Sequence, residues 1–201
     1  MSKYHSDLED GEYALLRSFF PKAKEMTIKE IMKHSSYSSY ERNNSYLNSL
    51  AKKKVIQEKK IGKTLVYSLI PQNWFSKKAF HEYALNKARL FSERHKTIAN
   101  VIKELPEEEL DFCAVFGSYA KGTERKESDI DLLCITSNKE KIETALASIK
   151  RRYNIVFHSI IIPKTEFAKI KKENLEFWHD LITYEIIFKG YELFYYYAYE
   201  T

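Results

Sequence analysis

The middle of the chain, between Pro71 and Pro106, contains no glycine or proline. Within it, one largely apolar set of side chains recurs at alternating intervals of four and three residues: Ala84, Ala88, Phe91, His95, Ile98, Ile102 and Leu105. This spacing places the set on one face of a helix of about 30 residues. The sequence therefore predicts two folded parts, at residues 1–71 and 106–201, joined by a connecting helix at residues 72–105.

Two ways of covering the apolar face of this helix remain open. The face can pack against the chain's own two parts, or against the same helix of a second copy in a homodimer. A homodimer would also suit a protein that binds a two-fold symmetric DNA site. His95 lies in this face, and we interpret it as a half-buried histidine rather than as a switch.

The two halves of the chain differ in charge. Residues 1–105 contain 20 Lys and Arg against 11 Asp and Glu, a net charge of +9, whereas residues 106–201 contain 13 against 17, a net charge of −4. A basic surface attracts the phosphates of nucleic acids, and an acidic surface repels a polyanion unless a cation lies between them. We therefore expect the two halves to have different partners, with nucleic acid as the partner of the first.

The composition excludes several classes of protein. The chain is 44% hydrophobic and 30% charged, with 5 Gly and 4 Pro, which excludes collagen-like and low-complexity disordered chains. No run approaches 18 uncharged apolar residues, and residues 1–10 lack the apolar core of a signal peptide. We therefore expect a folded cytoplasmic protein with no membrane partner. Cys113 and Cys134 each lie in an apolar run, so both are predicted to be buried, reduced thiols.

Three helices followed by two strands are predicted in the basic half. The helices are expected at residues 11–20, 28–34 and 40–53, and the strands at residues 55–58 and 64–69. Thr27 and Glu30 have the spacing of a capping box at the start of the second helix. Gly62 lies between the two strands, where it supplies the turn of a hairpin.

This order of elements, over residues 8–70, resembles the winged helix-turn-helix domains of prokaryotic transcription regulators. An α-helix fits the major groove of duplex DNA, where Asn and Arg side chains pair with base edges. The candidates for base contacts lie on the third helix: Arg42, Asn43, Asn44 and Asn48. The candidates for phosphate contacts lie on the hairpin: Lys59, Lys60 and Lys63. Because winged helices also serve as protein-docking or structural modules, DNA binding and protein docking are both open at this point.

The acidic half contains a short apolar run, residues 112–116, that ends at Gly117 and Ser118. Glycine allows a sharp turn and a close approach of backbone amides to a ligand, and the serine adds a hydroxyl at the start of a short helix. These two residues therefore predict a phosphate-binding turn.

Eleven residues after Ser118, Asp129 and Asp131 open a second apolar run. Residues two apart on a strand project from one face, about 7 Å apart, so both carboxylates are expected on one face while Ile130 and Leu132 point to the core. Two such carboxylates repel each other unless a cation bridges them. Their hard oxygen ligands suit Mg²⁺, which in turn binds substrate phosphates.

The segment from Phe116 to Leu133 resembles the signature of the polymerase β type nucleotidyltransferase superfamily, and most closely its small prokaryotic, antitoxin-like members. The resemblance extends from Leu110 to the C-terminus. It implies that Gly117, Ser118 and Lys121 bind the triphosphate of a nucleoside triphosphate, and that the catalytic residues Asp129 and Asp131 bind Mg²⁺. It also implies a protein hydroxyl as acceptor, as in antitoxins that nucleotidylate a toxin, while a small molecule or a nucleic-acid end stays open.

One departure from this pattern bears on activity. Active members of the superfamily usually carry a third carboxylate on a later strand, whereas residues 154–162 contain no Asp or Glu. In this segment Asn154 is a candidate metal ligand through its carbonyl oxygen and His158 a candidate base, although a histidine in a strand is more often structural. Glu166 is interpreted first as a charge at a helix start. Two functions therefore stay open. One is Mg²⁺-dependent nucleotidyl transfer, and the other is a DNA-binding regulator whose second domain senses nucleotide or binds a partner without turnover.

The other predicted elements complete an α+β fold with a mixed sheet in the second part. Helices are expected at residues 142–149 and from residue 175 to about residue 190. The aromatic tail, residues 191–199, is predicted to form a final strand, with an exposed docking strip as the alternative.

Overall fold

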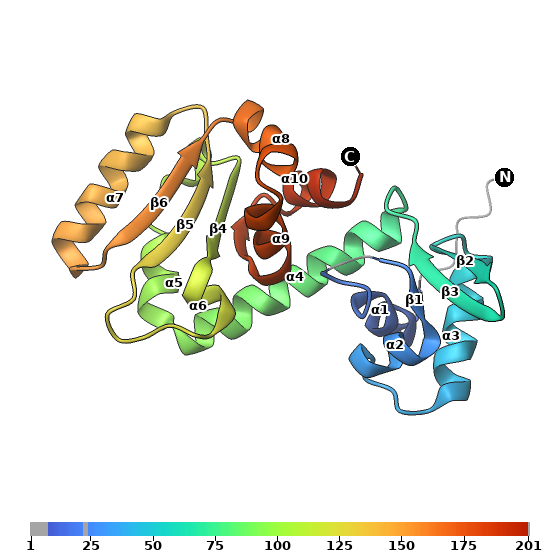
Figure 1. The fold of residues 1–201 in the computed structure, drawn as a ribbon. Coiled ribbons are helices and arrows are strands. Elements are labelled where there is room, and N and C mark those ends of the chain that lie inside the picture. The colour runs from blue at the N-terminus through green and yellow to red at the C-terminus, as the bar shows by residue number, and fades with distance from the viewer. Residues whose placement is uncertain (1–7, 22–23, 201) are drawn as a thin grey trace, which may run out of the picture. The chain divides into compact units, whose positions relative to one another are not determined.

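A computed structural model describes residues 8–21 and 24–200, so residues 1–7 of the N-terminal segment considered above lie outside these ranges. The chain divides into two compact units, residues 1–83 and residues 84–199, and the division falls within helix α4 (Trp74–Arg94). Both units combine helices with a sheet, which confirms the α+β class (Figure 1). Across the described ranges, no helix is both long enough and apolar enough to cross a bilayer.

The first unit consists of three helices and a small antiparallel sheet. Its elements are α1 (Asp10–Arg17), β1 (Met26–Thr27), α2 (Ile28–His34), α3 (Tyr40–Lys52), β2 (Ile56–Ile61) and β3 (Thr64–Leu69). The strands have the order β1-β3-β2. The predicted capping box is present, since Glu30 N donates to Thr27 Oγ1 at 3.3 Å and Thr27 N donates to Glu30 Oε2 at 2.8 Å. Gly62 has a φ of 59° in the β2–β3 turn, as the hairpin requires.

The predicted connecting helix is wrong in one respect, because it is two helices. Helix α4 ends at Arg94, α5 (Lys96–Ile102) follows, and His95 between them has φ −120° and ψ 54°. The His95 ring packs 4.7 Å from the ring of Phe91 and 5.4 Å from that of Tyr119, centroid to centroid. These contacts favour a local break that the apolar spacing alone did not indicate.

The apolar face of these helices packs inside the second unit. Phe91, Ile102 and Leu105 belong to one buried cluster together with residues of the sheet, such as Val115 and Leu132. Packing against the chain itself therefore accounts for this part of the face, and at these three positions no apolar surface is left for a second copy.

The second unit is built on a mixed four-stranded sheet. Its strands are β4 (Phe112–Phe116), β5 (Ile130–Ile135), β6 (Phe157–Ile162) and β7 (Ile186–Lys189), in the order β6-β5-β4-β7. Strand β4 is antiparallel to β5 and β7, and β5 is parallel to β6. The flanking helices are α6 (Gly117–Lys121), α7 (Lys139–Tyr153), α8 (Lys164–Glu173), α9 (Leu175–Tyr184) and α10 (Tyr191–Tyr195).

Helices cover both faces of this sheet (Figure 1). Cys113, Cys134 and Leu132 point into the core shared with α5 and α7, and both cysteines are buried and free, as predicted. On the opposite face the ring of Phe112 stacks on Phe167 of α8 at 5.8 Å and on Phe194 of α10 at 5.6 Å. The alternation along β4 thus separates two apolar cores.

The C-terminal predictions are wrong in two places. Helix α9 ends at Tyr184, and residues 186–189 form strand β7 instead of extending the helix. The aromatic tail forms α10 and a turn of π-helix (Tyr196–Glu200) instead of a strand. Gly190 explains the change of direction, since its φ is 84° and a Cβ there would overlap the carbonyl oxygen of Asp111. Phe194 and Tyr195 are both buried in this helix. In a strand, these two neighbours would point to opposite faces.

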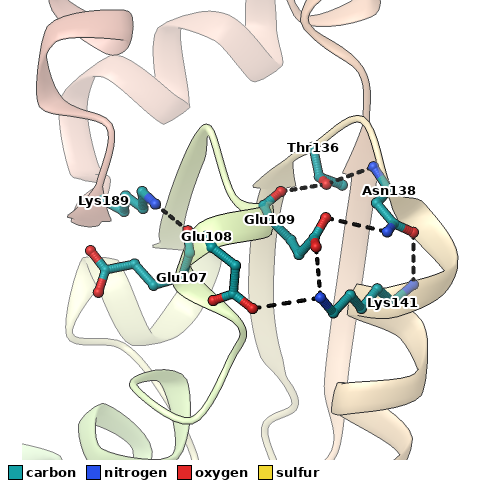
Figure 2. A network of polar contacts seen from close by, with 7 residues as sticks. All are labelled: Glu107, Glu108, Glu109, Thr136, Asn138, Lys141 and Lys189. Atoms are coloured by element: carbon teal, nitrogen blue, oxygen red, sulfur yellow. Dashed lines mark hydrogen bonds and ion pairs between the residues drawn. The ribbon is translucent and has the colours of Figure 1, made fainter.

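A polar network lies at the end of the sheet where β4 begins and β5 ends (Figure 2). Lys141 Nζ lies 2.6 Å from Glu109 Oε1 and 3.5 Å from Glu108 Oε1, and Thr136 Oγ1 donates to the carbonyl oxygen of Glu109 at 2.6 Å. The hydrogen bond from Lys141 lowers the pKa of Glu109, and the same bond raises the pKa of Lys141. The acidic run at residues 107–109 is therefore engaged in contacts at this end of the sheet and is no candidate for the functional site.

Candidate functional site

The turn between β4 and α6 is shaped by Gly117. Its φ is 68°, in the region that favours glycine, and a Cβ at this position would overlap Oδ2 of Asp131 and lie 2.8 Å from its Cγ. The backbone of the predicted phosphate-binding turn therefore packs directly against one of the two predicted aspartates. Ser118 follows on α6, half-buried, and its hydroxyl makes no hydrogen bond to another described residue.

Gly117→Ala is expected to displace the Asp131 carboxylate and to destabilise the unit by about 1–3 kcal/mol through the left-handed backbone. Gly122→Ala is the matched control, because Gly122 has a φ of 69° but no atom within 4 Å of an added Cβ. Both variants should lose stability in urea unfolding through the left-handed backbone, and Gly117→Ala should lose more because its Cβ also overlaps Asp131. Only Gly117→Ala should also lose nucleotide binding. Equal binding by the two variants would show that the contact with Asp131 has no role in binding.

Asp131 lies on β5, where its neighbours across the sheet are Phe116 on β4 and His158 on β6. Its side chain is 25% exposed, so the carboxylate is partly shielded but open to a ligand. Asp129 precedes the strand and is exposed. Ile130 and Leu132 are buried in the core shared with α7, on the face opposite Asp131.

His158 is brought beside Asp131 by the parallel pairing of β5 and β6. Its Nδ1 lies 3.1 Å from Asp131 Oδ1, and its side chain is 73% exposed. Asn154 and Glu166 do not join them. Asn154 ends α7 with a φ of 53°, before β6 begins, and Glu166 lies exposed in the first turn of α8. His158 is thus the residue of this segment that the structure places next to Asp131.

Lys121 is engaged by α9. Its Nζ lies 2.8 Å from Asp180 Oδ2 and 5.4 Å from the centre of the Tyr184 ring. The pKa of Lys121 is raised, chiefly by the hydrogen bond to Asp180, and the charge of Asp131 adds to the shift. Sequence reasoning missed Asp180, because no local pattern distinguishes it from other polar residues of an amphipathic helix. An open cavity of about 330 Å³ lies beside this pair, lined by Lys121, Asn174, Glu176, Phe177 and Asp180.

The oxygen atoms of the site suit a divalent cation that is bound partly by the protein and partly by a substrate. Among the described residues, no three His, Cys, Asp or Glu side chains gather into a ready-made metal centre. Asp131 and the nearby Asp129 offer carboxylate oxygens, which are the ligands that Mg²⁺ takes when phosphates and water complete its shell. A Cβ at position 117 would occupy the space against Asp131 Oδ2, so the glycine keeps that carboxylate accessible.

The candidate DNA-contacting residues of α3 divide into two groups. Arg42 and Asn48 are exposed and Asn44 is half-buried. Asn43 is fully buried, and its Nδ2 donates to the carbonyl oxygens of Tyr37 at 2.9 Å and Ser39 at 2.7 Å.

Asn43 therefore holds the loop before α3 and is withdrawn as a base-contacting candidate. Helical spacing alone did not distinguish it from the exposed Asn48. On the hairpin, Lys60 and Lys63 are exposed, and Lys59 Nζ lies 3.2 Å from Glu25 Oε1.

The second unit is similar to known nucleotidyltransferases. The family model described as "Polymerase beta, Nucleotidyltransferase" matches residues 96–192. A protein of Methanocaldococcus jannaschii named "Putative protein adenylyltransferase MJ0141" is 32% identical in an alignment 82 residues long. The alignment covers 38% of this chain and 79% of that protein. A crystal structure titled as a putative nucleotidyltransferase from Sulfolobus solfataricus is 22% identical over 52% of this chain and 85% of that chain. Its TM-score of 0.25 is too low to support a statement about the fold.

The matched residues include the Gly117 turn, both aspartates and His158. Because the M. jannaschii match is 32% identical and covers 79% of that protein, and because the family model matches residues 96–192, the chain belongs to the polymerase β nucleotidyltransferase family.

Proposed function

We propose that residues 106–201 transfer a nucleoside monophosphate from a nucleoside triphosphate to an acceptor hydroxyl, at the site formed by Gly117, Ser118 and Asp131. The observation that supports the proposal is the packing of the Asp131 carboxylate against the Gly117 turn, because a candidate cation ligand then lies beside a candidate phosphate-binding turn. Ser118 contributes a hydroxyl at the same turn, and Asp129 a second carboxylate.

In this reaction the acceptor oxygen attacks the α-phosphorus. A bond forms between them, the bond from the α-phosphorus to the oxygen shared with the β-phosphate breaks, and pyrophosphate leaves with that electron pair while the hydroxyl proton passes to water. A divalent cation, when bound, offsets the negative charge of the phosphates. The residues of the chain orient the substrate: Gly117 and Ser118 hold the phosphate tail, and Asp129 and Asp131 fix the cation. Lys121 reaches a phosphate after leaving Asp180.

A protein hydroxyl is the acceptor that we propose. The M. jannaschii relative is named as a protein adenylyltransferase, and the resemblance to antitoxin-like members agrees with an acceptor of this class. The transferred nucleotide is then an adenylyl or another nucleotidyl group on a Ser, Thr or Tyr side chain of a partner.

The test uses two labelled nucleotides. The full chain is incubated with extract of its source cells and with a triphosphate labelled at either the α- or the γ-phosphate. We expect the α label to move onto protein and the γ label to leave as pyrophosphate. Transfer of the γ label instead would mean phosphoryl transfer, which contradicts the proposal.

We also propose that residues 1–71 form a winged helix-turn-helix domain that binds duplex DNA. The support is the order of three helices and a hairpin, the net positive charge of this half, and the exposure of Arg42 and Asn48 on α3 with Lys60 and Lys63 on the hairpin. Helix α3 would contact base edges and the hairpin the phosphates.

Replacing both Lys60 and Lys63 with Ala is expected to weaken binding to any duplex and to reduce the slope of log K against log salt by about 2, since each lost phosphate contact removes about 0.9. Fluorescence anisotropy with an unrelated duplex, measured from low to high salt, checks the slope. Lys150→Ala with Arg151→Ala, two exposed cations on α7, is the control that should leave it unchanged. An unchanged slope in the Lys60 and Lys63 variant would contradict the proposed DNA contact.

A second candidate function is a regulator that binds nucleotide without turnover. The observations that favour it are the position of His158 beside Asp131 in place of a carboxylate, and the ion pair that holds Lys121 on Asp180. Nucleotide binding without transfer of the α label would favour this second function.

A further inference from the structure

We propose that His158 supplies a nitrogen ligand to the divalent cation held by Asp131, so that the site takes a divalent transition-metal ion in preference to Mg²⁺. This inference rests on the proposed function, because it uses the same carboxylate. It adds a metal ligand and a metal preference to that function.

The separation of the two donor atoms is the first argument. Asp131 and His158 are direct neighbours across the parallel strands β5 and β6, and Oδ1 of the first lies 3.1 Å from Nδ1 of the second. Two ligands at right angles on one ion, each about 2.1 Å from it, are about 3.0 Å apart. The strand register therefore holds an oxygen and a nitrogen at the separation of adjacent ligands.

The surroundings of the two side chains are the second argument. Oδ2 of Asp131 faces Gly117, which leaves Oδ1 as the oxygen on the side of His158. The imidazole is 73% exposed, and Asp131 is its only hydrogen-bond partner among the residues that the structure describes. An ion can thus approach both atoms from solvent without displacing any other contact of the ring.

The nature of the ligands gives the metal preference. Mg²⁺ binds oxygen ligands almost exclusively, whereas imidazole nitrogen is a good ligand for transition-metal ions such as Fe²⁺, Ni²⁺ and Zn²⁺. Mn²⁺ prefers oxygen ligands but also accepts an imidazole nitrogen, so it serves as the spectroscopic probe. A carboxylate at the same position would instead add an oxygen and a negative charge. His158 in place of a carboxylate therefore shifts the preference away from Mg²⁺.

The test measures metal binding to the full chain without nucleotide. Mn²⁺ is titrated and followed by electron paramagnetic resonance, and pulsed spectra of the bound ion report nitrogen in its coordination shell. We expect one bound Mn²⁺ per chain with a directly coordinated nitrogen. In His158→Asp the nitrogen signal should vanish, and Mg²⁺ should displace Mn²⁺ at about tenfold lower concentration, the effect expected from one changed ligand.

The control is His34→Asp, which changes an exposed histidine of the first unit and should alter neither reading. Bound Mn²⁺ without coordinated nitrogen, or an unchanged competition with Mg²⁺ in His158→Asp, would overturn the role of His158 and leave the proposed function standing. Absence of Mn²⁺ binding in the wild type without nucleotide, with its fold intact by circular dichroism, would also overturn the role of His158. The transfer of the α label would still decide the proposed function.

Discussion

Asp131→Asn is expected to lower the rate of nucleotidyl transfer by about 10³-fold, because it removes a full charge from the cation site while keeping the size of the side chain. Asp131 is the aspartate that contacts both the Gly117 turn and His158, so its charge acts where the phosphates are expected to bind. The measurement is the initial rate of transfer of the α label at saturating nucleotide.

The matched control for this variant is Asp111→Asn. Asp111 lies just before β4, at the end of the strand far from Gly117, and its Oδ1 is 2.8 Å from Lys164 Nζ. This control loses the same charge from the same sheet and should keep its rate within about a factor of two, since exposed ion pairs contribute little. A rate of Asp131→Asn equal to that of Asp111→Asn would remove Asp131 from the catalytic machinery.

The largest pH-dependent change in stability is expected at Glu185, which lies between α9 and β7. Its carboxyl group is completely buried, and burial raises its pKa from 4.5 to about 8. Lys87 Nζ is 3.6 Å away, and its charge opposes the shift without cancelling it. Neither oxygen of Glu185 has a hydrogen-bond partner among the described residues, so the neutral acid is the form that the site favours.

The direction of the effect follows from the order of the two pKa values. The contribution of the protonated Glu185 carboxyl to stability is fully present below pH 4.5, where this carboxyl carries its proton in both the folded and the unfolded chain. As pH rises towards 8, the unfolded chain releases its proton first, and the free energy of unfolding falls. A difference of about 3.5 pK units corresponds to a loss of up to about 5 kcal/mol.

Glu185→Gln removes this titration while keeping the shape of the side chain. Between pH 5 and about pH 8.5, we expect the free energy of unfolding of the wild type to fall by several kcal/mol relative to that of this variant. Urea unfolding at each pH measures the difference. Glu192→Gln, on the exposed side of α10, is the control and should follow the wild type. A difference between wild type and Glu185→Gln that stays constant with pH would contradict the raised pKa.

Local patterns in the sequence predicted the elements whose stability is local. Thr27 and Glu30 form the expected capping box, and helix α7 forms around the expected apolar face, although it is longer than predicted. Predictions failed where contacts distant in sequence decide the structure. His95 breaks the long helix through a ring contact with Tyr119, and the tail from Tyr191 becomes helical because Phe194 stacks on Phe112.

The candidate site shows the same division. Gly117, Ser118, Asp129 and Asp131 could be proposed as candidates from their spacing, because they lie in or next to a turn and a strand that local sequence predicts. The position of His158 beside Asp131 depends on the register of two strands separated by helix α7. The partner of Lys121 depends on the packing of α9 on α6, for which the sequence carries no local signal.

The most direct test of the central claim is a crystal structure of the chain with Mn²⁺ and a triphosphate whose bond between the α- and β-phosphates resists cleavage. We expect the phosphate tail on the backbone of Gly117 and Ser118, and the metal ion between Asp131 and the α-phosphate. The assignment of this site to nucleotidyl transfer would be contradicted by a nucleotide bound elsewhere, with the Asp131 carboxylate still hydrogen-bonded to His158 and in contact with no metal ion.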